Sequence, residues 1–435
     1  MLIELKVTNF RSIREQQTFS LVASNADKEL PNCILERNLP GLAGVKFLKG
    51  AAIYGANASG KSNLIDAVDF IGNYVRRSAV SIQPGEATGA QPFKLDSSSL
   101  DKPSSFEITF FTENTRFVFG FSITPKRVVE EYLYAYPNGL PQKWYHRAYD
   151  VESGEYKWEK PSAAFRQDKS LQDKTRDNSL FLSVGPQFNH AQLTMAYKWI
   201  ATHLRVLNNA RQTISPIYTM GMVPDPVWGK RVLNLLRSAD IGVSDARIVE
   251  KQEPADDIKA QFIEVDPADG KPRKDKEPQP LKVTRGTTHV SLYHRGEANA
   301  AVALDFGKEE SLGTQRFFSL IGPWLETMHN GYTVFIDEIE TSLHPLLVRE
   351  LLKLLFSDGN NPGGAQVVFT THNPILLDNT LMRRDQIWFT EKTPAGATHL
   401  YPLTDYSPRK DEALAKGYLA GRYGAIPFIP EGLQL

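Results

Sequence analysis

Residues 55–62 constrain this chain more than any other part of its sequence. They read Gly-Ala-Asn-Ala-Ser-Gly-Lys-Ser, the spacing of a phosphate-binding loop. The loop follows a short apolar run, residues 46–54, and precedes residues 62–74, whose apolar side chains recur at helical spacing. Glycines let backbone N–H groups curl around a phosphate, and the following helix presents the positive end of its dipole. The sequence therefore predicts a strand, a phosphate-binding loop and a helix, in that order.

The side chains of this loop predict how a nucleotide and its Mg²⁺ ion would be held. Lys61 is expected to reach the β- and γ-phosphates, and the Ser62 hydroxyl is expected to bind Mg²⁺. The chain has no Asn-Lys-x-Asp motif for reading guanine, so ATP is the expected nucleotide. The other expected contacts from this segment are Gly55, Asn57, Ser59, Gly60 and Asn63.

Two acidic residues, Asp337 and Glu338, follow an apolar segment that is typical of a buried strand, residues 332–336. Asp337 can hold Mg²⁺ through water, and Glu338 is then placed to orient or deprotonate the water that attacks the γ-phosphate. A plain strand end with acids on its solvent side is the alternative. Because the chain also carries the phosphate loop, we expect an enzyme that hydrolyses ATP to ADP and phosphate, with Lys61, Glu338 and His372 as catalytic residues.

Polar residues after other strands are candidates for sensing the γ-phosphate. His372 follows the apolar segment 366–370, and we expect it to contact the γ-phosphate, although a lone histidine in a loop is more often structural. Gln91 lies between the helix of the phosphate loop and a set of alternating strands, where simple solvation is the alternative. For His344 the sequence leaves a catalytic and a structural role open.

A second phosphate-binding surface is predicted at the start of a helix over residues 314–329. Ser311, Gly313 and Thr314 lie at its N-terminus, where small and hydroxyl-bearing residues can bind phosphate. One chain needs only one such cradle for each ATP, so the second is expected to dock against the ATP of another subunit. Ordinary helix capping by Ser311 is the alternative.

The pattern of strands and helices predicts an α/β fold with an antiparallel β-subdomain and a largely helical insertion. Residues 1–165 are expected to form a first ATPase lobe with the antiparallel strands of residues 106–136. Residues 166–285 are expected to form the helical and charged insertion, and residues 286–435 the second lobe. The further expected helices are residues 190–207, 226–238 and 345–356, and an exposed loop or long hairpin tip is expected at 251–285.

Composition excludes some classes of function. Fifty basic and fifty acidic residues give a net charge of zero, which excludes a chain whose whole surface acts as a polycation on nucleic acid or lipid. The net charge does not exclude a local basic groove on the surface. The single cysteine, Cys33, cannot form an internal disulfide, and no apolar run approaches the ~18 residues of a membrane span. Charges at Glu4 and Lys6 interrupt any signal-peptide core. We therefore expect a soluble cytoplasmic protein with no membrane partner.

These motifs resemble an ABC-type ATPase head of the SMC, RecF and OLD-like group. Five segments carry the resemblance, and they are residues 9–13, 55–62, 310–314, 334–338 with 340–345, and 371–372. The resemblance implies a head with a mixed central sheet and an antiparallel β-subdomain. It also implies that two heads form a homodimer or higher homo-oligomer with ATP between them. Lys61 and Ser62 of one subunit would face Ser311 and Gly313 of the other. Glu338 would be the general base, and His372 and Gln91 would sense the γ-phosphate.

The Glu-Ser-x-Gly-Thr sequence at 310–314 departs from the usual Leu-Ser-Gly-Gly signature. With the ending at residues 418–427, it resembles stand-alone bacterial phage-defence ATPases of the RloA/AbiLi and PARIS types. That resemblance implies a nucleotide-dependent sensor that binds and controls a separate effector, a toxin or nuclease encoded nearby. The alternatives are a RecF- or SMC-like repair ATPase that binds DNA and a scaffold whose ATP is purely structural.

Overall fold

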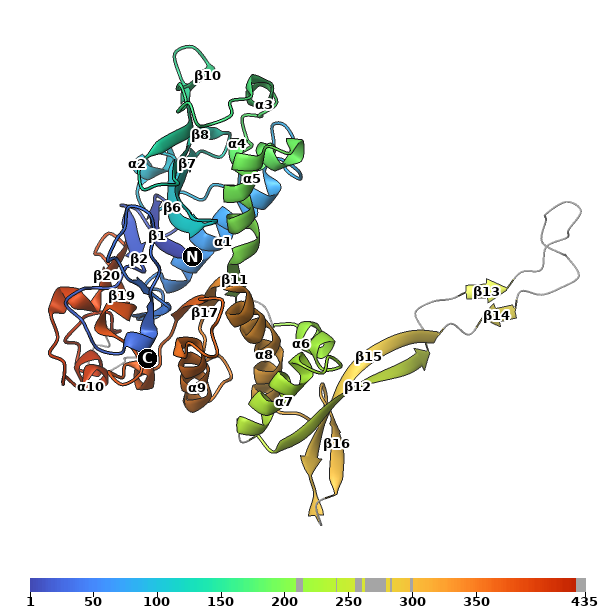
Figure 1. The fold of residues 1–435 in the computed structure, drawn as a ribbon. Coiled ribbons are helices and arrows are strands. Elements are labelled where there is room, and N and C mark those ends of the chain that lie inside the picture. Colours follow the sequence, from blue (N-terminus) through green and yellow to red (C-terminus); the bar gives the residue numbers. More distant parts are fainter. Residues whose placement is uncertain are drawn as a thin grey trace, which may run out of the picture. The chain divides into compact units, whose positions relative to one another are not determined.

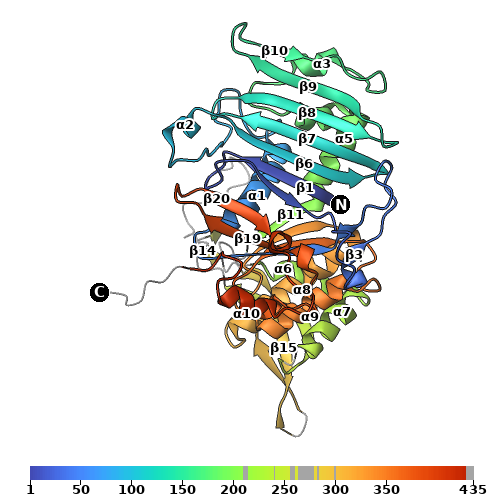
Figure 2. The same cartoon turned by 90° about the vertical axis from the view of Figure 1, so that its left-hand side faces the viewer.

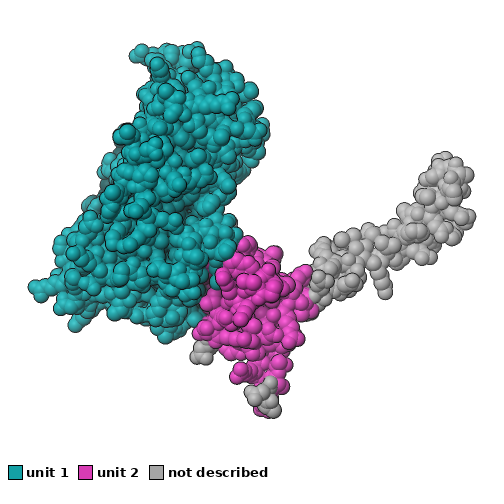
Figure 3. Space-filling view, viewed as in Figure 1, with its two compact units in different colours: residues 1–213, 325–435 teal, residues 214–324 magenta. Residues whose placement is uncertain are grey.

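The computed structural model describes residues 1–208, 214–239, 241–254, 260–262, 279–281, 284–297 and 300–427. The chain divides into two compact units, shown in two colours in Figure 3. One unit comprises residues 1–213 and 325–435, and the other comprises residues 214–324. The lobe boundaries expected after residues 165 and 285 stay a prediction.

The first unit contains a six-stranded central sheet in the order β11-β17-β18-β5-β19-β20 (Figure 1). Five neighbouring strands are parallel, and only the edge strand β20 runs antiparallel to its neighbour. The carboxyl ends of β17, β18 and β5 therefore lie at one edge of the sheet, where ligands bind in sheets of this kind. The strands are β5 (Gly50–Gly55), β11 (Leu204–Asn208), β17 (Thr333–Asp337), β18 (Gln366–Thr370), β19 (Ile387–Lys392) and β20 (Thr398–Pro402).

A second sheet of this unit has seven antiparallel strands in the order β10-β9-β8-β7-β6-β1-β2 (Figure 2). It confirms the antiparallel strands expected at residues 106–136, and with the mixed central sheet it confirms the α/β fold. Its strands are β1 (Leu2–Thr8), β2 (Gln17–Ser20), β6 (Ser104–Thr112), β7 (Thr115–Ile123), β8 (Val128–Tyr136), β9 (Gln142–Asp150) and β10 (Glu155–Trp158).

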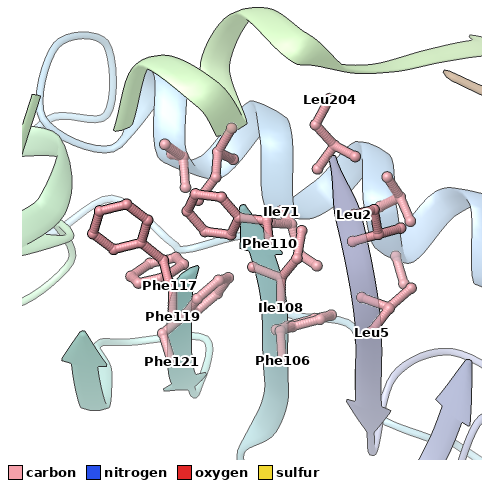
Figure 4. Packing of buried hydrophobic residues seen from close by; sticks show 14 of the residues in the cluster. Leu2, Leu5, Ile71, Phe106, Ile108, Phe110, Phe117, Phe119, Phe121 and Leu204 are labelled. Atoms are coloured by element: carbon pink, nitrogen blue, oxygen red, sulfur yellow. The ribbon is translucent and has the colours of Figure 1, made fainter. Parts of the chain in front are cut away.

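The helix that follows the phosphate loop, α1 (Lys61–Arg77), is anchored in the hydrophobic core. Its apolar side chains at helical spacing, such as Ile65 and Ile71, belong to one buried cluster with residues of both sheets. Figure 4 shows Ile71 beside the phenylalanines of β6 and β7. Burial of each such side chain contributes about 1.5–3 kcal/mol. The loop before α1 is therefore attached to a helix that the core holds firmly.

One sequence expectation about local structure was wrong. The helix expected over residues 190–207 ends earlier, because α5 (Ala191–Lys198) and one π-helical turn give way to β11 at Leu204. Residues 204–208 pair in parallel with β17, a partner far away in sequence that helical periodicity cannot reveal. Strands β19 and β20, which follow β18 in the sequence, complete the central sheet.

The second unit combines helices with a three-stranded antiparallel sheet, β12-β15-β16. Strands β12 and β15 pair over their whole length, up to the pair Pro254 and Thr284. The loop or hairpin tip expected at 251–285 lies mostly outside the described residues. The elements are α6 (Ile217–Met222), α7 (Trp228–Ser238), β12 (Val243–Pro254), β13 (Ala260–Phe262), β14 (Gln279–Leu281), β15 (Thr284–Arg295), β16 (Ala301–Asp305) and α8 (Leu312–Asn330), which ends in the first unit.

Shorter elements complete the first unit. They are β3 (Ile34–Leu35), β4 (Phe47–Leu48), α2 (Ser97–Leu100), α3 (Lys169–Asp173), α4 (Phe181–Val184), α9 (Pro345–Phe356) and α10 (Leu414–Leu419). Helix α9 has the bounds expected from the sequence. In the described part of the chain, no helix combines the length and the apolar character needed to span a bilayer.

Candidate nucleotide site

The phosphate loop connects β5 to α1, and two glycines allow it to pass close to β19 and β20. A Cβ atom on Gly55 would lie 2.4 Å from the Thr390 hydroxyl, and one on Gly60 would lie 2.0 Å from the Thr398 hydroxyl. Gly60 also has a φ of +110°, which other residues rarely adopt. The Ser59 hydroxyl is buried and lies 2.7 Å from that of Thr390, so this side chain faces β19. Strands β19 and β20 thus pack closely against the phosphate loop.

Lys61 begins α1 and folds back over the loop. Its Nζ donates hydrogen bonds to the carbonyl oxygens of Gly55, at 2.8 Å, and of Ala56, at 3.0 Å. Burial lowers the pKa of the ammonium group to about 8, and the nearby carboxylates of Glu338, Asp337 and Glu340 oppose that shift. A desolvated cation whose hydrogen-bond partners here are neutral carbonyls is well suited to bind phosphate oxygens.

Ser62, Asp337 and Thr370 form a hydrogen-bonded group where β17 and β18 end. The Ser62 hydroxyl donates to Asp337 Oδ1 at 3.2 Å, and the Thr370 hydroxyl donates to the same oxygen at 2.7 Å. The backbone N–H of Glu338 donates to the Thr370 hydroxyl at 2.7 Å. The predicted Mg²⁺ ligands Ser62 and Asp337 are therefore adjacent.

A hydroxyl and a carboxylate side by side fit Mg²⁺, which prefers hard oxygen ligands and keeps several waters and phosphate oxygens. The residues present thus fit the ion that the sequence predicts, and Ser62 and Asp337 are the side chains that would hold it. Across the described residues, no group of three or more His, Cys, Asp or Glu side chains is arranged to hold a metal ion.

Glu338 and His372 face each other across the ends of β17 and β18. Glu338 Oε1 lies 4.0 Å from His372 Nε2, and both side chains are partly exposed, at 40% and 37%. Glu338 has a φ of +49°, a strained backbone conformation of the kind that occurs at functional sites. Burial, reinforced by the charge of Lys61, lowers the pKa of His372 against the opposing carboxylates. The imidazole is therefore neutral at physiological pH, beside a carboxylate that water can reach.

Sequence reasoning assigned no role to Glu340, which reaches this site from the turn after β17. Its Oε1 accepts a hydrogen bond from the backbone N–H of His372 at 2.7 Å. The spacing Asp-Glu-x-Glu was visible in the sequence, but only the fold shows that the second glutamate reaches the loop after the neighbouring strand.

The remaining candidates of the first unit lie near the start of α1 or cap a helix. Gln91 accepts hydrogen bonds from Arg11, at 2.9 Å to its side chain and at 2.7 Å to its carbonyl, and Arg11 also pairs with Asp66 of α1. Asn63 donates to the hydroxyl of Ser12, and Asn57 is exposed at the tip of the loop. The His344 ring accepts the Leu346 N–H at the start of α9, which is a structural cap.

Ser311, Gly313 and Thr314 belong to the second unit, where they form the first turn of α8. The Ser311 hydroxyl accepts the backbone N–H of Thr314 at 3.1 Å and lies 2.9 Å from the Thr314 hydroxyl. The capping expected as the alternative is thus present. Ser311 is exposed and Gly313 is half-buried. A role for this turn at the phosphates of another copy stays a prediction.

The parallel strands, the phosphate loop and the acidic strand end define a nucleotide-binding domain of the P-loop class. Residues 51–378 match the family described as "AAA domain, putative AbiEii toxin, Type IV TA system". Because that match covers most of the chain, the protein belongs to this family of AAA domains.

Several solved structures are similar to this chain, each at 12% sequence identity. An SMC head bound to the C-terminal winged-helix domain of ScpA gives a TM-score of 0.44, over 92% of this chain and 97% of that one. The SMC head domain from Thermotoga maritima gives 0.38, over 92% and 98%. The SMC head with an extended coiled coil, bound to the C-terminal domain of ScpA from Pyrococcus furiosus, gives 0.40, over 93% and 97%. No curated protein sequence matches the chain.

Proposed function

We propose that this protein binds ATP with Mg²⁺ and hydrolyses it to ADP and phosphate. One observation carries the proposal. Lys61 and Ser62 from the start of α1, Asp337 and Glu338 from the end of β17, and His372 from the end of β18 converge at one edge of the central sheet. Cation, metal ligands, carboxylate base and neutral imidazole are the groups that phosphoryl transfer to water requires.

Each side chain has a role that follows from its position. Lys61 exchanges its loop carbonyls for phosphate oxygens, and Ser62 and Asp337 would hold Mg²⁺, which would neutralise charge on the phosphates. Glu338, which is partly exposed, accepts a proton from the attacking water. His372, neutral and close to Glu338, donates a hydrogen bond to the γ-phosphate or to that water.

The substitution Glu338→Gln tests the hydrolysis proposal, because it keeps shape and hydrogen bonding but removes the base. We expect ATP affinity within about threefold of the wild type and a loss of turnover of about 100-fold or more. Equal turnover in the two proteins would remove Glu338 from the mechanism and leave ATP as a structural ligand.

We further infer that ATP joins two copies of the chain, with the exposed Ser311 turn of one copy at the phosphates of the other. An ATP sandwich of this kind links nucleotide state to geometry, because bound ATP holds the copies together and hydrolysis releases them. Light scattering on the Glu338→Gln protein tests this inference. The mass should double with ATP and Mg²⁺ and stay that of one chain with ADP.

The resemblance to phage-defence ATPases and the family description, which names a toxin–antitoxin system, support a role in bacterial defence. We propose that the protein is a cytoplasmic sensor whose ATP state controls a separate toxin or nuclease encoded nearby. Co-expression with the neighbouring genes should yield a complex that co-purifies, and no partner from any neighbour would count against it. A steep loss of duplex DNA affinity with added salt would instead favour the DNA-repair alternative.

A further inference from the structure

The turn after β17 brings its two glutamates to different parts of His372. Ile339 between them is fully buried, and its N–H donates to the Thr370 carbonyl at 3.2 Å. The Glu338 carboxylate lies 4.0 Å from the His372 ring, whereas Glu340 reaches the backbone of the loop that follows β18. This turn therefore offers a second carboxylate to the site, in addition to that of the proposed base.

The loop after β18 is fixed on both sides of His372. Before it, the Thr371 N–H donates to the Ile53 carbonyl of β5 at 3.1 Å. After it, the Asn373 carbonyl accepts the Tyr54 hydroxyl at 3.3 Å. At His372 itself, the backbone N–H is held by Glu340 at 2.7 Å. Glu340 thus supplies the side-chain contact that fixes the backbone of His372 at the edge of the sheet.

The second oxygen of Glu340 shows that its charge also matters. Oε2 is buried and, within the described part of the chain, has no hydrogen-bond partner. A glutamine could accept the His372 N–H equally well, so a carboxylate here carries a desolvation cost that the hydrogen bond alone does not explain. Its negative charge acts on two groups of the site, Lys61 and His372, whose pKa values it raises against the effect of burial.

We propose that Glu340 is a positioning residue for ATP hydrolysis, which holds His372 in place through its backbone N–H and balances the charge of Lys61. The proposal rests on the proposed ATPase function and assigns to the second glutamate of Asp-Glu-x-Glu a role separate from that of Glu338. Glu340 neither touches the reacting water nor replaces the base. It keeps the loop that carries the γ-phosphate sensor at its working position.

Two substitutions separate the hydrogen bond from the charge. Glu340→Ala removes both, and Glu340→Gln keeps an acceptor for the His372 N–H but removes the charge. We expect Glu340→Ala to lower kcat by about 10- to 100-fold with the Kd for ATP within about threefold, as for other residues that orient a reactive group. Glu340→Gln should recover most of that kcat. The matched control Glu350→Ala removes an exposed carboxylate of α9 that pairs with Lys353, and should leave kcat unchanged.

Titration of the His372 ring by NMR, assigned with a His372→Ala sample, provides a readout that a purely structural role would not change. The charges acting on this ring are Lys61 of α1 and the carboxylates Asp337, Glu338 and Glu340. Loss of one negative charge favours the neutral ring, so Glu340→Gln should move the His372 midpoint to lower pH.

The outcomes distinguish this inference from the function on which it rests. A wild-type protein without ATP turnover would refute the proposed function, and the His372 titration would still test the effect of Glu340. With an active wild type, unchanged kcat per folded molecule in Glu340→Ala, or an unmoved His372 midpoint in Glu340→Gln, would overturn the role of Glu340 alone.

Discussion

Thr370 connects the predicted Mg²⁺ ligand Asp337 to the proposed base Glu338 through hydrogen bonds. Its replacement by valine tests whether these hydrogen bonds hold the site together. The side chain is fully buried at the end of β18. Its hydroxyl donates to Asp337 at 2.7 Å and accepts the backbone N–H of Glu338 at 2.7 Å. Valine has nearly the same shape, so Thr370→Val removes the two hydrogen bonds and leaves the packing in place.

The cost of this change follows from the two partners. A hydrogen bond to a charged carboxylate contributes about 1.5–3 kcal/mol, and a buried N–H left without an acceptor costs about 1–3 kcal/mol. We therefore expect a loss of about 3 to 5 kcal/mol in the free energy of unfolding. Glu338 would also lose the contact that fixes its strained backbone, so ATP turnover should fall about tenfold or more.

Urea denaturation followed by tryptophan fluorescence measures the first effect, and steady-state ATP hydrolysis measures the second. The matched control is Thr109→Val in β6, where a buried threonine contributes none of the described side-chain hydrogen bonds. A loss below about 1 kcal/mol for Thr370→Val together with normal turnover would refute the reasoning, since an orphaned buried donor should cost more.

Further predictions concern charge, burial and the loop. Burial lowers the pKa of Lys61 to about 8, so its positive charge is lost as pH rises through that value. The Kd for ATP, measured by calorimetry, should therefore increase with pH and approach a tenfold rise per pH unit. A Kd that stays constant from pH 7 to 9.5 would contradict this prediction. Glu131 and Arg147 form a fully buried ion pair at 2.8 Å. Glu131→Ala leaves the arginine charge unpaired and should lower the free energy of unfolding by about 3–5 kcal/mol in urea denaturation. A change below about 1 kcal/mol would argue against a stabilising role of this ion pair. Gly60→Ala should abolish ATP binding, because its Cβ would clash with β20. The control Gly85→Ala changes a glycine that also has a positive φ, +81°, but has open space around it, and this variant should bind ATP normally. Equal ATP binding by both variants would count against close packing of the loop on β20.

The sequence predicted the parts of the site that depend on local patterns. The phosphate loop has its own spacing, and Asp337, Glu338 and His372 each follow an apolar strand, so the edge at which they meet was predictable once the strands were known to be parallel. Helix α9 matched its expected bounds because its apolar spacing begins at Pro345.

Other features depend on contacts between distant residues, which one sequence does not reveal. The segment that forms strand β11 was expected to be the end of a helix. Its pairing with β17 joins residues more than a hundred positions apart, and local spacing does not reveal such a pairing. Ser59 is expected to contact the nucleotide, and only the fold shows that its side chain hydrogen-bonds to Thr390 of β19, a strand that local patterning did not indicate. Glu340 gained a role only through its bond to the loop after β18.

The central claim, that each ATP is held between two copies, is tested most directly by mixing two inactive variants. Lys61→Ala removes the phosphate-binding cation, and Ser311→Arg blocks the turn at the start of α8. A mixed dimer has one site with both Lys61 and Ser311 intact, because each copy supplies what the other lacks. An equal mixture should regain about a quarter of the wild-type ATP turnover, since half of the dimers are mixed and each has one working site. An inactive mixture whose mixed dimers are demonstrated by affinity tags would contradict the claim.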